Sequence, residues 1–93
     1  MAVGRAARRV EREPAVQASF GLDRAAAALD LLELLELAWH DCYAELTPPV
    51  DVINDVLVVA RGDMSTLARA ARLAVEDSRD LRLAADEVRR RAS

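Results

Sequence analysis

The residues best suited to chemistry in this sequence are one histidine and two carboxylates at helical spacing. His40 follows Glu36 by four positions and Glu33 by seven, so on a helix the three side chains lie on one face. Metal sites in helical bundles include carboxylate and histidine ligands that share one helix face in this way. Those sites also need ligands from facing helices and a Glu-to-His spacing of three. We therefore expect a solvated face and keep a carboxylate/histidine metal site as an alternative.

The single cysteine is the other reactive side chain. Cys42 comes three positions after Trp39 in an apolar pattern, so we expect both side chains to be buried and the thiol to react slowly. A phosphate-binding glycine loop, a paired-cysteine motif and a Ser-His-Asp arrangement are not recognisable in the sequence. The sequence therefore indicates no enzyme and no cofactor.

The elements that must position these residues are predicted to be helices. The 93 residues suit one small domain, and 3 Gly, 3 Pro and 3 aromatic residues leave little turn chemistry for many short strands. Two stretches, 22–47 and 63–93, contain neither Gly nor Pro. We expect an all-α fold in which two long antiparallel helices are joined by a short middle helix, and this hairpin forms a four-helix bundle as a dimer.

Apolar residues recur at alternating steps of three and four in both long stretches, as on the buried face of an amphipathic helix. The first apolar face contains Ala25, Ala28, Leu32, Leu35, Trp39, Cys42 and Leu46, and the second contains Met64, Leu67, Ala71, Ala74, Ser78, Leu81, Ala85, Val88 and Ala92.

The ends of the helices are predicted from capping residues and prolines. Asp23 is the expected N-cap of the first helix, which ends at Thr47 before Pro48. Gly62 ends the middle helix and Asp63 is a cap residue. A strand over 50–59 is the alternative to the middle helix, and cap-type residues at 76–80 leave open whether 63–92 is one helix or two.

Residues 1–20 have no clear apolar period, so we expect a flexible Arg-rich arm before a single helical domain over 21–93. Residues 1–13 lack the apolar run of a signal peptide, and the lone cysteine cannot form an internal disulfide, which indicates a cytoplasmic protein. The most apolar stretch, 25–39, contains Asp30, Glu33 and Glu36, so we expect no membrane-spanning helix.

Charge is divided unevenly along the chain. All 13 basic residues are arginine, and the net charge is +2 over 1–24, −7 over 25–63 and +2 over 64–93. In an antiparallel hairpin the arm and Arg89 to Arg91 form a basic pole, and Asp51, Asp55 and Asp63 belong to an acidic one.

The basic pole has two interpretations, of which one is an Arg-dependent nucleic-acid site. We expect instead that Arg89 to Arg91 complement the helix dipole and that the other arginines pair across the hairpin, so nucleic acid is not the favoured partner. The expected pairs join Arg69, Arg72, Arg79 and Arg82 to Asp30, Glu33 and Asp41.

Several leucines lie away from the apolar faces. With Leu35 at the centre of the first face, Leu34 lies about 100° to one side, Leu29 about 120° to the other and Leu37 about 160° round. Leu83 is displaced from the second face in the same way. These four leucines predict a homodimer interface. The alternative is a monomer in which the arm covers the leucines through Val10, Val16 and Phe20.

The string at residues 36–43, followed by Thr47-Pro48-Pro49 and Asp51-Val52-Ile53, resembles small uncharacterised helical proteins of actinobacteria. The resemblance covers about residues 30 to 88, implies an all-helical fold and carries no known catalytic motif. We therefore interpret the chain as a non-catalytic helical protein-interaction module that self-associates. The alternatives are the metal-binding protein and the Arg-dependent nucleic-acid binder.

Overall fold

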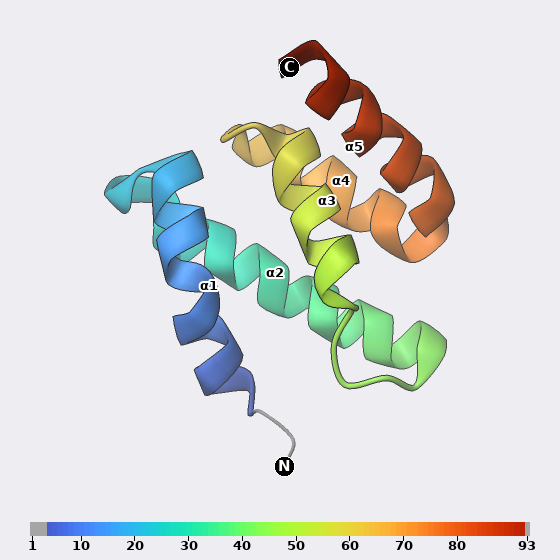
Figure 1. Ribbon diagram of the computed structural model, residues 1–93. Helices are drawn as coiled ribbons and strands as arrows, with labels where there is room; N and C mark the ends of the chain where they lie inside the picture. Colours follow the sequence, from blue (N-terminus) through green and yellow to red (C-terminus); the bar gives the residue numbers. More distant parts are fainter. Residues whose placement is uncertain (1–3, 93) are drawn as a thin grey trace.

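The computed structural model describes residues 4–92, which form helices and no strands, as the sequence predicts (Figure 1). The radius of gyration of 12.5 Å fits a compact domain, for which about 12 Å is expected at this length. The helices are α1 (Arg5–Phe20), α2 (Leu22–Tyr43), α3 (Val50–Ala60), α4 (Met64–Glu76) and α5 (Ser78–Ala92).

The segment expected to be an arm is helix α1 in the structure. It turns into α2 through Gly21 alone and packs against α2. Val16 and Phe20 are buried, but Val10 is exposed, so the apolar face of α1 is short. The other contacts of α1 with α2 are ion pairs made by arginines, which apolar periodicity does not indicate.

Helix α2 begins and ends at residues other than those expected. Gly21 is the N-cap, and Asp23 lies in the first turn, where its charge suits the helix dipole. The helix ends at Tyr43 because Ala44 adopts a left-handed conformation with φ of 58°. Residues 44–49 then lead to α3, and Pro49 is its N-cap.

The turn between α3 and α4 follows the predicted pattern. Residues 50–60 are helical rather than extended, and the Asp63 carboxylate caps α4 by accepting a hydrogen bond from the backbone N–H of Thr66 at 2.8 Å. Gly62 has a φ of +77°, and a Cβ there would lie 2.3 Å from the carbonyl oxygen of Ser19. Both its backbone conformation and its closeness to the end of α1 require glycine at this position.

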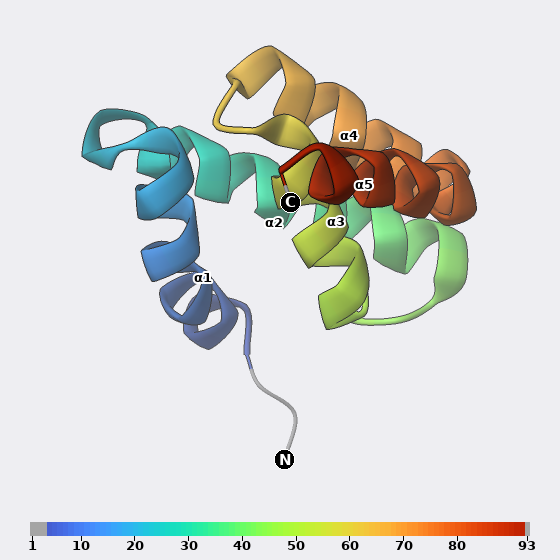
Figure 2. The ribbon, with the colours of Figure 1, turned by 45° about the horizontal axis from the view of Figure 1, so that its top comes forward.

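Residues 63–92 form two helices, the alternative that the cap-type residues at 76–80 left open, and not one long helix, because Asp77 separates α4 from α5. Asp77 has φ of −160°, and its Oδ1 accepts hydrogen bonds from the backbone N–H groups of Arg79 and Asp80, each at 3.1 Å. The division lets α5 turn and pack against α3 as well as α4 (Figure 2). The described helices therefore do not form the predicted hairpin of two long helices.

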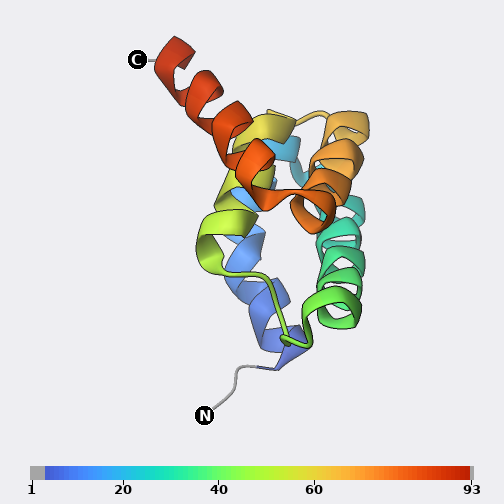
Figure 3. The same ribbon diagram turned by 90° about the vertical axis from the view of Figure 1, so that its right-hand side faces the viewer.

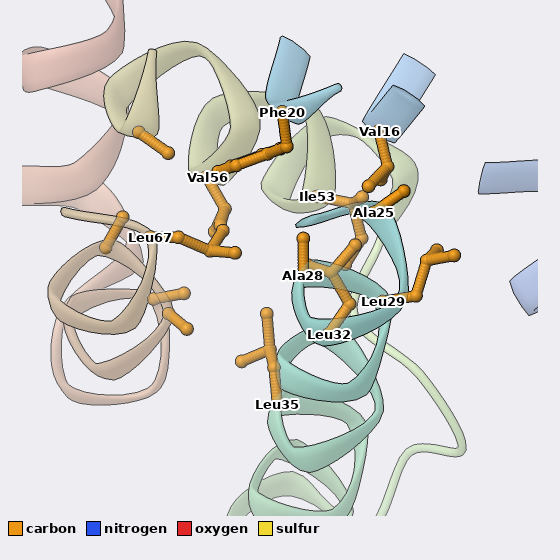
Figure 4. Packing of buried hydrophobic residues seen from close by; sticks show 14 of the residues in the cluster. Val16, Phe20, Ala25, Ala28, Leu29, Leu32, Leu35, Ile53, Val56 and Leu67 are labelled. Carbon is orange, nitrogen blue, oxygen red and sulfur yellow. The ribbon is translucent and has the colours of Figure 1, made fainter. Parts of the chain in front are cut away.

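The core lies where α1, α2, α3 and α4 meet. Val16 and Phe20 of α1 point toward Ile53 and Val56 of α3, with the apolar face of α2 beneath them (Figure 4). Viewed from the side, α1 and α3 lie on the left of the molecule and α2 and α4 on the right, and α5 extends away toward the C-terminal end (Figure 3). The predicted face of α2 is buried from Ala25 to Trp39.

Candidate functional site: two buried carboxylates and an apolar groove

Glu36 is buried between α1 and α2, where two arginines and a threonine surround its carboxylate. Its exposed fraction is 2%. Arg8 donates from Nε to Oε2 at 2.6 Å and from Nη2 to Oε1 at 3.3 Å, and Nη1 of Arg12 lies 3.0 Å from Oε2. The Thr47 hydroxyl donates to Oε2 at 2.9 Å and accepts from Nη2 of Arg12 at 3.0 Å. We call these four residues the Glu36 clasp.

The surroundings of Glu36 favour its charged form. Burial by itself raises the pKa of a carboxyl group, but the hydrogen bonds from Arg8 and Thr47 and the charge of Arg12 outweigh burial and hold the pKa of Glu36 below its ordinary value. The pKa of Arg8 is raised by the same contact. Glu36 is therefore an ionised structural group that joins α1, α2 and the 44–49 segment.

The metal-site candidates do not form a common site in the described chain. Glu33 lies 3.1 Å from Nη1 of Arg9, which also donates to Asp30 at 2.7 Å. His40 is exposed, and its Nδ1 lies 3.3 Å from the carbonyl oxygen of Glu45. Within residues 4–92 no group of three or more His, Cys, Asp or Glu side chains is placed to hold a metal ion. The expectation that Glu36 lies on a solvated face is wrong, because α1 covers that face.

Asp55 is the second buried carboxylate, and it lies between α3 and α5. Its side chain is 3% exposed. Arg82 donates from Nε to Oδ2 at 2.6 Å and Arg89 from Nη2 to Oδ1 at 2.9 Å, while Asp51 lies 3.6 Å from Nη2 of Arg82. We call Asp55, Arg82 and Arg89 the Asp55 clasp.

The Asp55 clasp corrects two expectations about charge. Arg82 pairs with acids of α3 rather than with Asp30, Glu33 or Asp41. Because Arg89 reaches Asp55, the basic C-terminal segment and part of the acidic segment lie together, so the two are not at opposite poles. The predicted pairing of Arg72 with α2 is also wrong, since Arg72 binds Glu76 on its own helix.

The other C-terminal arginines contact carboxylates of the same helix. Arg90 and Arg91 both pair with Glu87, and Arg89 pairs with Asp86 in addition to Asp55. These carboxylates offset part of the positive charge that a phosphate backbone would require.

An apolar groove lies between α2 and α4, with a volume of about 320 Å³. We call it the α2–α4 groove. Its charged residues are Arg72 and Glu76, which bind each other at 2.6 Å between Nε and Oε1. The groove is lined by Leu31, Leu34, Leu35, Ala38, Ala71, Arg72, Val75 and Glu76.

The four leucines proposed as an interface lie in different places. Leu29 is buried in the chain's own core, so its assignment to an interface is wrong. Leu34 lines the α2–α4 groove and is 60% exposed. Leu37 lies in a separate cleft near Arg5 and His40, and Leu83 lines neither of these two surfaces.

Aromatic residues join the end of α2 to its neighbours. Trp39 is buried as predicted, and its indole N–H donates to Oε1 of Glu45 at 2.9 Å. Its ring contacts that of Tyr43 with 4.4 Å between centroids, and the Tyr43 hydroxyl donates to the carbonyl oxygen of Val75 in α4 at 2.6 Å. Cys42 is exposed, so the expectation of a buried thiol is wrong. The helix ends one residue later, and no residue within 4–92 covers this part of the predicted face.

The arginines of α1 are the residues that analysis of the sequence missed. Arg8, Arg9 and Arg12 have the spacing of one helical face, as do Glu33 and Glu36 on α2. Complementary charges at this spacing on two neighbouring helices are the signal that could have located the Glu36 clasp.

Comparison of the chain with protein-family models, with curated proteins and with solved structures finds no match. In the part of the chain that the structure describes, the helices are too short or too polar to cross a membrane.

Proposed function

We propose that this chain is a non-catalytic helical protein-interaction module that self-associates through the α2–α4 groove. The observation that carries the proposal is the combination of an apolar lining with a largely exposed leucine, Leu34, at that groove. Exposed apolar grooves of this kind on small domains are typical of interaction sites. The only ionisable groups in the lining are Arg72 and Glu76, and they pair with each other.

The charges of the groove favour a second copy of the chain as the occupant. Arg72 and Glu76 lie one helical turn apart on α4 and are both well exposed. In a two-fold dimer with antiparallel α4 helices, Arg72 of one chain lies beside the partner's Glu76, and the reverse pair forms at the same time. Leu34 of each chain then enters the groove of the other. This arrangement would pair both exposed charges of the groove with those of a second copy.

The decisive measurement is the mass of the protein by light scattering at micromolar concentration. We expect twice the chain mass of 10.2 kDa for the unmodified protein. Leu34→Glu is expected to give single chains with an unchanged helical circular-dichroism spectrum. Leu83→Glu is the matched control, because Leu83 has nearly the same exposed fraction, 62%, and lies outside the groove. A monomeric unmodified protein, or equal effects of the two substitutions, would contradict the proposal.

Charge reversal tests the orientation of the two chains. Arg72→Glu alone places like charges next to each other across the interface and is expected to weaken the dimer. Adding Glu76→Arg restores opposite charges and is expected to recover the affinity. If the double variant dissociates as readily as the single one, the antiparallel arrangement of α4 is wrong.

A further inference from the structure

The connection between α1 and α2 consists of Gly21 alone, in a conformation that other residues avoid. Its φ is 80° and its ψ is 163°, in a region populated essentially by glycine. A Cβ at this position would meet no atom within 4 Å, so the requirement for glycine comes from the backbone angles and not from crowding. The N-terminus of α2 also has no side-chain cap.

Helix-forming sequence continues on both sides of Gly21. If Gly21 adopts helical angles, residues 5–43 become one helix, about 58 Å long at about 1.5 Å per residue. The N–H groups of the first turn of α2 would then bond to the carbonyl groups of the last turn of α1, which otherwise end two separate helices. Glycine is tolerated inside a helix at modest cost. The opened chain thus gains backbone hydrogen bonds at the junction.

The residues that join α1 to α2 lie at nearly equal distances along the chain before and after Gly21. Such spacing is what an exchange of α1 between two copies would require. Arg9 and Glu33 lie twelve positions before and after Gly21, and Arg8 and Glu36 lie at thirteen and fifteen. Two continuous helices that cross in antiparallel directions near residue 21 would therefore place Arg8 of each chain beside the partner's Glu36. In the closed chain α1 already diverges from α2 and lies on the outside of the molecule (Figure 2).

We infer that α1 is an exchangeable helix. It separates from its own α2 by a change of backbone angles at Gly21 and packs against α2 of a second copy. The Glu36 clasp and the contacts of Val16 and Phe20 re-form between chains, so the exchanged dimer keeps the interactions of the closed chain. Its formation depends on protein concentration, because joining two chains costs translational freedom. This exchange does not depend on the α2–α4 groove, and the experiments below use Leu34→Glu chains to remove association through that groove.

A pair of charge-reversed chains tests the exchange directly. One chain carries Glu36→Arg, and the other carries Arg8→Glu with Arg12→Glu. Each chain alone has like charges in its own clasp, whereas the exchanged pair has opposite charges in both clasps. We expect the equimolar mixture to form two-chain particles and to have a higher thermal midpoint than either chain alone, with at least a tenfold preference for the mixed pair. Because the readout is recovery on mixing, it remains valid if either chain fails to fold alone. A mixture that shows only the separate masses and midpoints overturns the inference.

Substitution of the hinge gives a second test. Gly21→Ala disfavours the closed corner and favours the continuous helix, so we expect at least a tenfold increase in the association constant. Gly4→Ala is the matched control, because Gly4 has an ordinary φ of −69° and open space around it. Inserting Gly-Ser-Gly after Gly21 relaxes the closed corner and should favour single chains. A Gly21→Ala chain that stays monomeric, whether folded or unfolded, overturns the inference.

Discussion

The two buried carboxylates of this chain, Glu36 and Asp55, are each bound by two arginines from another helix, yet water reaches the two clasps differently. Arg8 and Arg12 are each only 14% exposed, whereas Arg82 and Arg89 are 47% and 42% exposed. If a carboxylate is removed, the arginines around Asp55 can turn toward water, but those around Glu36 stay largely covered. Similar ion pairs can therefore contribute differently to stability, because the cost of an unpaired charge depends on its access to solvent.

The largest effect is expected for Glu36→Ala. Removing this carboxylate leaves two covered arginines and the Thr47 hydroxyl without their acceptor, so we expect a loss of about 3–5 kcal/mol in the free energy of unfolding. Urea unfolding followed by circular dichroism measures it. Glu33→Ala on the same helix is the control, for which about 0–1 kcal/mol is expected because its pair with Arg9 is more exposed. Equal losses for the two variants would show that burial of the Glu36 clasp has no energetic consequence.

A smaller loss, about 1–3 kcal/mol, is expected for Asp55→Ala. Arg82 and Arg89 lose an acceptor but regain hydration, and Arg89 keeps its contact with Asp86. The same urea titration gives the value. A loss as large as that of Glu36→Ala would contradict the proposed role of solvent access.

The dependence of stability on pH separates the charge of Glu36 from its packing. Its pKa in the folded chain lies below the ordinary value of 4.5, so the unfolded chain binds more protons in acid. The stabilisation is complete above about pH 4.5 and is lost as the pH falls through the lower folded pKa. We expect Glu36→Gln to remove this part of the decline between neutral and acid pH, as measured by urea midpoints. An unchanged acid dependence in Glu36→Gln would assign the decline to other carboxyl groups.

The smallest effect is expected for Arg90→Ala, which removes a pair between two exposed side chains. Arg90 and Glu87 lie on the same helix and remain hydrated when separated, so the urea midpoint should not change measurably. This variant supplies the baseline against which both clasps are compared. A clear loss of stability would mean that exposed pairs contribute more than their solvation suggests.

Local patterns in the sequence located much of the core and several helix ends. The apolar face from Ala25 to Trp39 was predictable because the pattern of burial repeats with the helical period. The cap at Asp63 was predictable because a short carboxylate before a helix accepts a backbone N–H directly. Helix α1 was not, since only Val16 and Phe20 form its buried apolar face.

Of the α2–α4 groove, the sequence indicated Leu34 as an exposed interface residue and placed Leu35 and Ala71 on separate apolar faces. Leu29 has a similar displacement from the predicted face but is covered in the core that α1 helps to form. The groove itself depends on which helix packs beside α2, and Val75 and Ala71 of α4 are far from Leu34 in the chain. Neither composition nor spacing specifies such a neighbour.

By itself, the sequence determined that the chain is helical and that the apolar face of α2 from Ala25 to Trp39 faces inward, because both follow from the helical spacing of apolar residues. Only the tertiary structure decided that Glu36 and Asp55 are buried ions and that α4 and α5 separate at Asp77. A charged side chain at a given helical position is solvated or buried according to what packs over it. For Glu36 the arginines of α1 supply both the cover and the opposite charge that makes burial tolerable.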